Sequence, residues 1–243
     1  MQENVQINRK GVEINEESFL QGVKDCIPTL LGYLSIGFAA GVVEKTAGLS
    51  ITEITLMSVL IYAGSAQFII AGMIAAHGSA AAIVFTVFFV NLRHLLLSAA
   101  LSPYFRHLTP LKNVLVGSLL TDETFGVAIN QTANKQSISE KWMHGLNITA
   151  YLNWIAANIA GAFLGQWITN PEKFGLDFAL PAMFIGLLVL LIVSRSKIAV
   201  DIIVAIAAVL IAVGVSFVSS ASIGVIVATI VAAAIGMAVE KWK

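Results

Sequence analysis

Residues 80–101 read AAAIVFTVFFVNLRHLLLSAAL, an apolar run that carries Asn91, Arg93 and His94 near its middle. A helix of about 20 apolar residues crosses the hydrocarbon core of a bilayer, which is roughly 30 Å thick. A cation at the bilayer centre costs on the order of 3 kcal/mol on insertion scales, so it normally faces a protein-lined or watery interior. This run therefore predicts a membrane-spanning helix whose polar residues line a solute pathway.

The composition of the whole chain also indicates a membrane protein. Hydrophobic residues make up 58% of the sequence and charged residues 12%, whereas a soluble domain carries about 25% charged residues. The formal net charge is zero and no long basic block occurs, so we expect no nucleic-acid partner. A single cysteine excludes an intrachain disulfide and a cysteine-rich metal site. We expect small solutes and the lipid bilayer as partners, and neither a metal nor a cofactor.

Apolar runs of similar length recur along the chain and predict an all-α polytopic membrane protein. Together with the run above, taken as 79–101, they give eight transmembrane helices, and seven is the alternative count. The other predicted spans are 27–43, 54–76, 113–131, 146–168, 178–193, 198–218 and 221–239.

The chain before the first span divides into two parts. Residues 1–18 are polar and lack the features of a signal peptide, so they predict a cytoplasmic tail. Residues 19–25 are amphipathic and predict a short interfacial helix. We expect residues 19–243 to form a single transmembrane transport domain. An excess of Lys and Arg on the N-terminal side of the spans places both termini in the cytoplasm, although the basic loop 106–112 falls on the opposite side.

The same spacing between two glycines occurs in the first and in the fourth predicted span. Gly32 and Gly41 have the same separation as Gly117 and Gly126. An offset of three helices would invert the second copy in the membrane, so helices 1–3 and 4–6 would form the inverted repeat typical of many secondary transporters. The alternative is two unrelated glycine-rich helices, because glycine matches in apolar sequence also arise by chance.

The second predicted span contains Tyr62-Ala63-Gly64-Ser65-Ala66-Gln67-Phe68. Small residues followed by a carboxamide suit a broken helix whose freed backbone groups line a cavity. Gly64, Ser65 and Gln67 are therefore candidates for substrate binding. The alternative is close helix packing, because Gly, Ala and Ser are the usual interface residues of membrane helices.

Polar residues in the third span form a stripe on one helical face, because Asn91, His94 and Ser98 follow helical spacing. Arg93 points to a neighbouring face and suits a substrate carboxylate, which its planar guanidinium binds with two hydrogen bonds. A structural ion pair with Asp122 or Glu123 is the alternative. His94 is a candidate proton relay, with a hydrogen-bonded core histidine as the alternative.

The pair Asp122-Glu123 falls within the fourth predicted span, between two threonines. Adjacent residues point about 100° apart on a helix, so one carboxylate can face a cavity while the other meets Arg93. Carboxylates inside a membrane mark proton relays or bind cations such as a substrate ammonium. The alternative is that the span lies a few residues away and both carboxylates are interfacial. In the fifth span, Asn153 and Trp154 lie on or beside a polar and aromatic stripe that we expect to line the same cavity.

Two glycine pairs have the spacing of close helix contacts. They are Gly37 and Gly41 in the first span and Gly161 and Gly165 in the fifth. Small residues at this spacing let helix backbones approach one another. We expect these glycines to serve packing rather than chemistry.

Four of these motifs together resemble the AzlC family, the large subunit of bacterial branched-chain amino acid exporters. They are Gly32-Tyr33, Ala63-Gly64-Ser65-Ala66-Gln67-Phe68, Asn91-Leu92-Arg93-His94 and Thr121-Asp122-Glu123. The resemblance implies export of valine, leucine and isoleucine across the bacterial cytoplasmic membrane. It also implies a small membrane partner of the AzlD type.

These observations combine into one hypothesis of a membrane transporter that is not an enzyme. The expected substrate-binding residues are Tyr33, Gly64, Ser65, Gln67, Asn91, Arg93, Asp122, Asn153 and Trp154, and the expected proton-coupling residues are His94, Asp122 and Glu123. A proton gradient is the expected energy source because the chain lacks a Walker phosphate loop. One alternative is a non-transporting scaffold or sensor. The other is an intramembrane hydrolase with Ser65 as nucleophile and His77, His94 or His144 as base.

Overall fold

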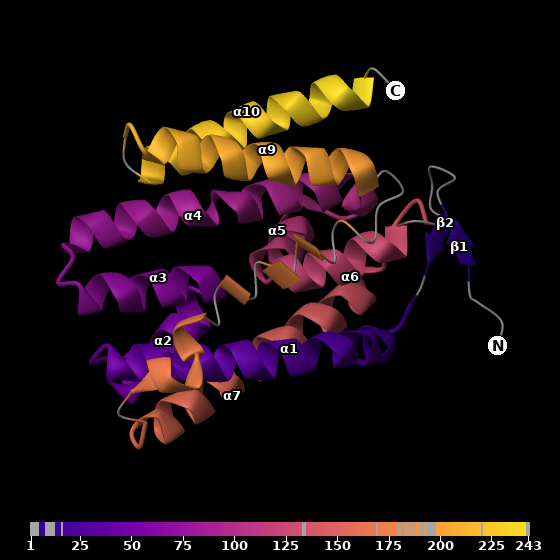
Figure 1. Ribbon diagram of the computed structural model, residues 1–243. Coiled ribbons are helices and arrows are strands. Elements are labelled where there is room, and N and C mark those ends of the chain that lie inside the picture. Colours follow the sequence, from indigo (N-terminus) through magenta and orange to yellow (C-terminus); the bar gives the residue numbers. More distant parts are fainter. Residues whose placement is uncertain are drawn as a thin grey trace. The chain divides into compact units, whose positions relative to one another are not determined.

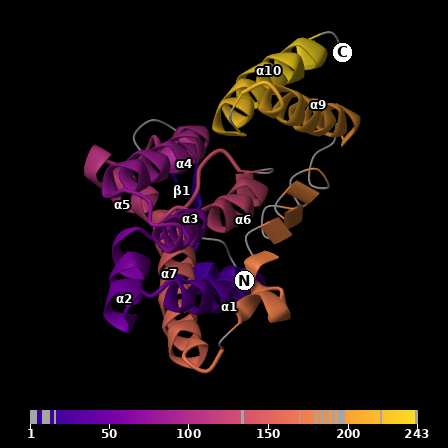
Figure 2. The ribbon, with the colours of Figure 1, turned by 60° about the vertical axis from the view of Figure 1, so that its left-hand side comes forward.

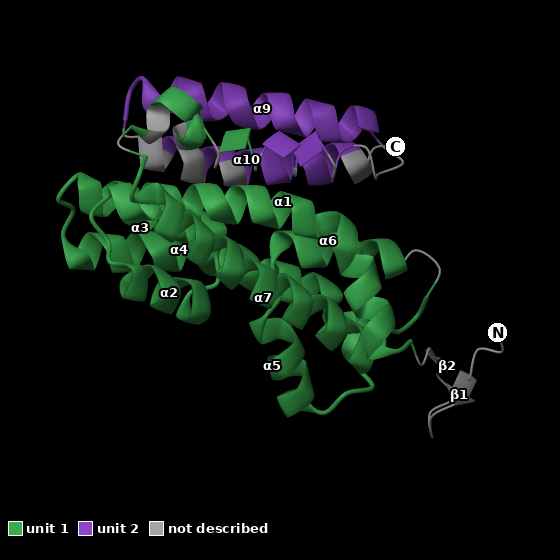
Figure 3. Cartoon of the chain, turned by 90° about the horizontal axis from the view of Figure 1, so that it is seen from below, with its two compact units in different colours: residues 1–184 green, residues 185–243 purple. Residues whose placement is uncertain are grey.

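The computed structural model describes residues 5–7, 13–15, 17–132, 135–168, 170–178, 181–182, 185–186, 188–189, 192, 198–219 and 221–241. The chain divides into two compact units, Met1–Phe184 and Ile185–Lys243, shown in different colours in Figure 3. Half of the predicted span 178–193 lies outside the described residues.

In the described residues of the first unit, the secondary structure is helical apart from a short pair of strands near the N-terminus (Figure 1). The strands β1 and β2 pair in antiparallel register with Val5 opposite Asn15, inside the predicted polar tail. The elements of this unit are β1 Val5–Ile7, β2 Glu13–Asn15, α1 Phe19–Thr46, α2 Ile51–Leu60, α3 Gly64–Ala75, α4 Ala80–Leu101, η1 Ser102–Phe105, α5 Pro110–Ser118, α6 Asp122–Thr132, α7 Glu140–Gly165, η2 Pro171–Phe174 and η3 Leu176–Phe178.

The second unit contains a helical hairpin. Helix α9, Ile198–Ser216, packs antiparallel against α10, Ala221–Lys241. The helices approach closely at small residues, because a Cβ added to Gly224 would lie 2.5 Å from Ser216 Oγ and one added to Gly236 would lie 3.1 Å from Val204.

Within the described residues, four helices are long and apolar enough to cross a membrane. They are Phe19–Thr46, Ala80–Phe105, Glu140–Gly165 and Ile198–Ser216, and Ile51–Leu60, Gly64–Ala75 and Ile230–Val239 are shorter apolar helices. The prediction of an all-α polytopic membrane protein is confirmed at this level. The count of eight spans stays a prediction.

Helix α1 begins earlier than predicted and leaves no separate interfacial helix at 19–25. Ser18 caps its N-terminus by accepting a hydrogen bond from the Gln21 amide at 3.2 Å. The polar residue Asp25 continues the helix because it accepts hydrogen bonds from Gln21 Nε2 and Trp142 Nε1, each at 2.8 Å. The predicted span began only at residue 27, after Asp25, because hydropathy does not take such hydrogen-bond partners into account.

Helices α1 and α7 pack directly on each other along much of their length in the first unit (Figure 2). A Cβ added to Gly41 would lie 2.1 Å from the Asn158 carbonyl oxygen, and one added to Gly161 would lie 2.1 Å from that of Phe38. Gly22 and Gly145 make equally close backbone contacts further along the same pair. The prediction that the glycine pairs allow close packing is confirmed for these two helices.

Two segments are each broken into two half-helices. The break between α2 and α3 falls at residues 61–63, as the sequence predicted, and Tyr62 takes a left-handed conformation with φ of 44°. The segment 113–131 was predicted as one helix, and this is wrong because α5 ends at Ser118 and α6 begins at Asp122. The reason is a local cap: Thr121 and Thr124 bond reciprocally through backbone amides and hydroxyls, at 2.9 and 3.4 Å.

The two glycine pairs with the same spacing do not lie in matching local structure. Gly32 and Gly41 lie in the uninterrupted helix α1, whereas Gly117 lies in α5 and Gly126 in α6. An inverted repeat of helices 1–3 and 4–6 therefore stays a prediction.

Candidate substrate site

A small cavity lies where the two helix breaks meet α1, α4 and α7. Its free volume is about 10 Å³, which is about the space of one water molecule. The cavity combines aromatic rings with ionisable groups. Its lining residues are Tyr33, Tyr62, Ala63, Gly64, Arg93, His94, Thr121, Asp122, Glu123 and Trp154.

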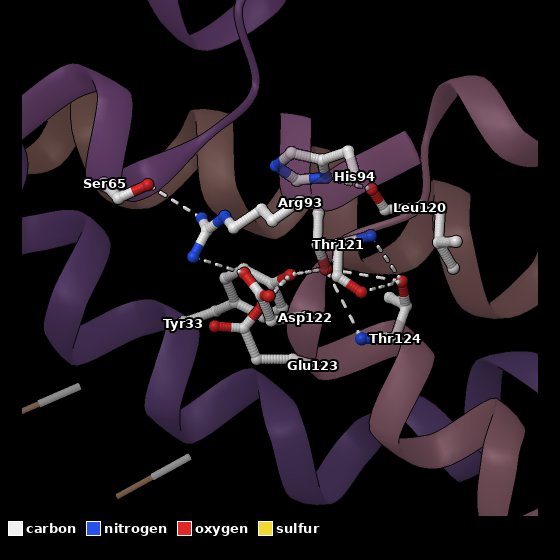
Figure 4. Close-up of polar contacts among 9 residues, drawn as sticks. All are labelled: Tyr33, Ser65, Arg93, His94, Leu120, Thr121, Asp122, Glu123 and Thr124. Atoms are coloured by element: carbon white, nitrogen blue, oxygen red, sulfur yellow. Dashed lines mark hydrogen bonds and ion pairs between the residues drawn. The ribbon is translucent and has the colours of Figure 1, made fainter. Parts of the chain in front are cut away.

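Arg93 is the central cation of this site and connects three helices (Figure 4). Its Nη1 lies 3.0 Å from Asp122 Oδ2 on α6, and its Nη2 donates to Ser65 Oγ on α3 at 2.7 Å. The side chains of Arg93 and Asp122 are 22% and 20% exposed, so the ion pair is mostly withdrawn from the surface. Of the two carboxylates considered from sequence, Asp122 is the one that meets Arg93.

The neighbouring carboxylate points in another direction. Glu123 Oε2 accepts a hydrogen bond from the Tyr33 hydroxyl of α1 at 2.9 Å. The same hydroxyl is hydrogen-bonded to Thr121, the capping residue of α6. The expected divergence of adjacent side chains therefore allows Asp122 to face α4 and Glu123 to face α1.

His94 lies beside this ion pair. Its Nδ1 is 3.1 Å from the Leu120 carbonyl oxygen, and a carbonyl only accepts, so Nδ1 carries the hydrogen (Figure 4). Its Nε2 is buried and has no hydrogen-bond partner within the described part of the chain. The imidazole therefore has an open acceptor beside the cavity.

Two helices begin at the cavity. Helix α3 starts at Gly64 with Ala63 as its N-cap, and no side chain caps its first amides. Helix α6 starts at Asp122. The N-terminus of a helix carries partial positive charge and free N–H groups, so it attracts anions. The carboxylate of Asp122 complements one of these helix ends, and the other is open to a ligand.

The structure places the remaining expected site residues outside the cavity lining. Gln67 is fully buried and hydrogen-bonds with residues of other helices, including Trp154 Nε1, which donates to Gln67 Oε1 at 2.7 Å. Asn153 Nδ2 donates to the Leu30 carbonyl at 3.2 Å. Asn91 is half-buried on α4 and does not line the cavity. Ser65 reaches the site through its bond to Arg93.

Several residues at or near the site were not among the expected binding or proton-coupling residues, although some of them lie in the quoted motifs. Tyr62 and Ala63 form the first break, and Thr121 caps α6. The spacing of Thr121 and Thr124 around two acidic residues is a sequence signal for a helix start. Glu44, fully buried at the end of α1, has no such signal because a carboxylate after an apolar run usually marks the end of a span.

The hydrolase alternative finds no support in the contacts of Ser65. Its hydroxyl accepts from Arg93, and no histidine hydrogen-bonds to it among the described residues. A nucleophilic serine requires a base within hydrogen-bond reach. The described geometry does not provide that pair.

Comparisons with known proteins place the same region in one family. The family model of the AzlC protein matches residues 28–168, which include every residue that lines the cavity. The chain is 33% identical over 176 residues to the inner membrane protein YgaZ of Escherichia coli, covering 70% of this chain and 72% of that protein. It is 31% identical over 162 residues to the branched-chain amino acid transport protein AzlC of Bacillus subtilis, covering 65% and 62%. An uncharacterized membrane protein of Archaeoglobus fulgidus is 28% identical over 172 residues. No solved structure matches the chain significantly.

Proposed function

Because the chain belongs to the AzlC family, we propose that it exports valine, leucine and isoleucine from the bacterial cytoplasm. The observation that carries this proposal is the Arg93–Asp122 ion pair at a cavity between two broken helices. An arginine and an aspartate side by side match the two charges of an amino acid zwitterion. Transport, rather than catalysis, agrees with the name of the Bacillus subtilis relative.

The zwitterion binds by replacing the ion pair with two new ones. The substrate carboxylate binds to the guanidinium of Arg93. It lies near the uncapped start of α3, where free N–H groups of the helix add to the attraction. The substrate ammonium forms an ion pair with the carboxylate of Asp122. Each buried charge keeps a partner throughout, which avoids the large cost of leaving one of them unpaired in a low-dielectric site.

The aliphatic side chain of the substrate requires more space than the described cavity provides. A volume of about 10 Å³ holds one water molecule at most. Opening the Arg93–Asp122 pair separates α4 from α6 and widens the cavity between Tyr33, Tyr62 and Trp154. Burying a leucine side chain on these aromatic rings contributes roughly 2 kcal/mol.

The wider transport cycle follows from the same proposal. The chain crosses the cytoplasmic membrane eight times, with its N-terminus in the cytoplasm and two inverted halves that expose the cavity alternately to each side. Protons drive export, and His94, Asp122 and Glu123 are the candidate groups at the site that relay them. A small AzlD-like membrane subunit completes the transporter.

The test is efflux of labelled leucine or valine from preloaded cells that express the chain with and without a candidate small subunit. Membrane abundance is matched between the samples. Efflux that depends on both chains supports the paired exporter, and efflux from this chain alone makes the subunit accessory. No efflux in either case, with both proteins in the membrane, contradicts the proposed function.

A Ser65→Ala variant is expected to weaken transport without abolishing it. The change removes one hydrogen bond to the Arg93 guanidinium and leaves the Asp122 pair intact. A hydrogen bond to a charged group is worth about 1.5–3 kcal/mol, so the apparent KM for leucine should rise about tenfold or more. Ser35→Ala, an exposed serine of α1, is the control and should leave KM unchanged. An unchanged KM in Ser65→Ala would remove Ser65 from the site.

A further inference from the structure

A second polar cluster lies next to the cavity, buried among four helices. It contains Glu44 of α1, Ser58 of α2, Gln67 of α3 and Asn158 of α7, and none of the four has any exposed surface. The Gln67 amide Nε2 lies at its centre, 3.1 Å from Glu44 Oε1, 3.2 Å from Ser58 Oγ and 3.3 Å from Asn158 Oδ1. The cluster plays no part in the binding geometry described above.

The acceptors around Gln67 Nε2 outnumber its hydrogens, and the Ser58 hydroxyl and Asn158 Nδ2 donate to other oxygens, the carbonyls of Ile54 and Trp154, each at 2.9 Å. The Gln67 amide has two N–H groups, and three oxygens lie within reach of them. The other carboxyl oxygen, Glu44 Oε2, is buried and has no hydrogen-bond partner within the described part of the chain. A proton bound to Glu44 relieves this shortage, because it turns an acceptor into a donor. A metal cation fits less well, because the centre of the cluster is occupied by the N–H groups of Gln67.

No charged group of the described side chains compensates Glu44. Lys45, the next residue, donates to the Leu49 carbonyl at 3.3 Å, and Glu53 on α2 bonds to Ser50 at the start of its own helix. Helix α3 carries no titratable residue. Among the described side chains, no ion pair or hydrogen bond joins Glu44 to the other titratable groups on α1, on the elements packed against it or at the nearby helix break. These groups are Lys24, Asp25, Cys26, Tyr33, Tyr62, Asp122, Glu123, Glu140, Lys141, His144, Tyr151 and Lys173.

An ionised carboxylate in such surroundings is costly. Burial of a charge without an opposite charge costs several kcal/mol, and a buried carboxyl normally binds a proton instead. Carboxyl groups inside membrane proteins are for this reason typical components of proton pathways. Glu44 has the two properties that such a group needs, which are burial and an unoccupied oxygen.

The cluster is connected to the cavity by α3 and by one indole ring. Helix α3 carries both Ser65, which bonds to Arg93, and Gln67, which bonds to Glu44. Trp154 lines the cavity and donates from Nε1 to Gln67 Oε1 at 2.7 Å. Its ring also contacts the start of α3, because a Cβ added to Gly64 would lie 2.8 Å from it. A substrate that moves Arg93 or Trp154 therefore also moves Gln67, whose side-chain amide donates a hydrogen bond to Glu44.

We propose that Glu44 is the proton-binding group that couples the proton gradient to transport, with α3 as the moving element. One proton binds to Glu44 from the outside and leaves to the cytoplasm as one amino acid moves outward. Substrate entry at Arg93 shifts α3, changes the hydrogen bond from Gln67 to Glu44 and so changes the affinity of Glu44 for its proton. The proposal rests on the proposed export function and adds its coupling site.

The experiment compares two leucine fluxes in proteoliposomes that contain the full chain, together with the small subunit if transport requires it. One flux is net efflux driven by an imposed proton gradient. The other is exchange of internal labelled for external unlabelled leucine without a gradient. Glu44→Gln, which keeps the shape of the side chain and removes its titration, should retain exchange and lose the stimulation by the gradient. Glu53→Gln, the same change at an exposed carboxyl, should retain both, and Glu44→Asp should restore part of the stimulation.

Three results would overturn the proposal. They are gradient-stimulated efflux of wild-type size in Glu44→Gln, loss of exchange together with efflux in a folded Glu44→Gln protein, and stimulation by a sodium gradient in place of a proton gradient. Infrared spectra of the purified wild-type protein give a readout that needs no transport. A protonated-carboxyl band that shifts on leucine addition and is absent in Glu44→Gln is expected, and its presence in Glu44→Gln would contradict the assignment. Failure of wild-type flux alone would reject the export function and leave the infrared test standing.

Discussion

Arg93→Ala is expected to reduce leucine efflux to background while the protein still inserts in the membrane. The change removes the one cationic side chain proposed to bind the substrate carboxylate and leaves Asp122 without this cation. Two hydrogen bonds to a charged group disappear together, which weakens substrate affinity by on the order of 100-fold. The measurement is initial efflux of labelled leucine at matched membrane abundance.

Two further arginine variants sharpen this prediction. Arg106→Ala changes an exposed arginine in the loop after η1 and should leave efflux unchanged. Arg93→Lys keeps the charge but loses the forked geometry, so we expect efflux between those of the wild type and Arg93→Ala. Normal efflux from correctly inserted Arg93→Ala would show that the ion pair with Asp122 is purely structural.

Gly161→Leu is expected to prevent accumulation of the folded protein. Even a Cβ at this position would lie 2.1 Å from the Phe38 carbonyl oxygen, and that backbone atom cannot move without separating α1 from α7. Overpacking in a tight interface costs about 1–3 kcal/mol for smaller insertions, and a leucine at a backbone contact exceeds that. The measurement is protein abundance in the membrane, together with the melting temperature of any protein extracted in detergent.

Gly32→Leu is the matched control for this second prediction. Gly32 is exposed on α1, and a Cβ there would meet nothing within 4 Å. This variant should accumulate like the wild type, because its new side chain faces outward. Equal abundance of the Gly161 and Gly32 variants would mean that the α1–α7 contact does not determine folding.

Hydropathy predicts the long helices of this chain well because the ability of a helix to cross a membrane depends on its length and composition. The span 79–101 corresponds to α4, and 198–218 corresponds to α9. Small residues before Gln67 also predicted the break between α2 and α3. The break at 119–121 could not be read from hydropathy because it depends on hydrogen bonds between two threonines, although their spacing is a cap signal.

Part of the candidate site could also be predicted from the hydropathy pattern. Polar residues in apolar runs identified Arg93, His94 and Asp122, all of which line the cavity. The sequence does not show in which direction a side chain points. Asn153 was therefore expected at the cavity, whereas in the structure its side chain donates a hydrogen bond to the Leu30 carbonyl. Glu44 was not singled out because its partner Gln67 is distant in the chain. Only the tertiary fold reveals that a carboxylate at the end of an apolar run is buried.

The most direct measurement of the proposed site is leucine binding to the purified protein, compared with binding of two analogues that each lack one charge. Isoamylamine keeps the ammonium and lacks the carboxylate, and 4-methylpentanoate keeps the carboxylate and lacks the ammonium. If Arg93 and Asp122 bind the two ends of the zwitterion, leucine binds and both analogues bind far more weakly, and Arg93→Ala loses leucine binding. Equal binding of leucine by the wild type and Arg93→Ala would contradict this site.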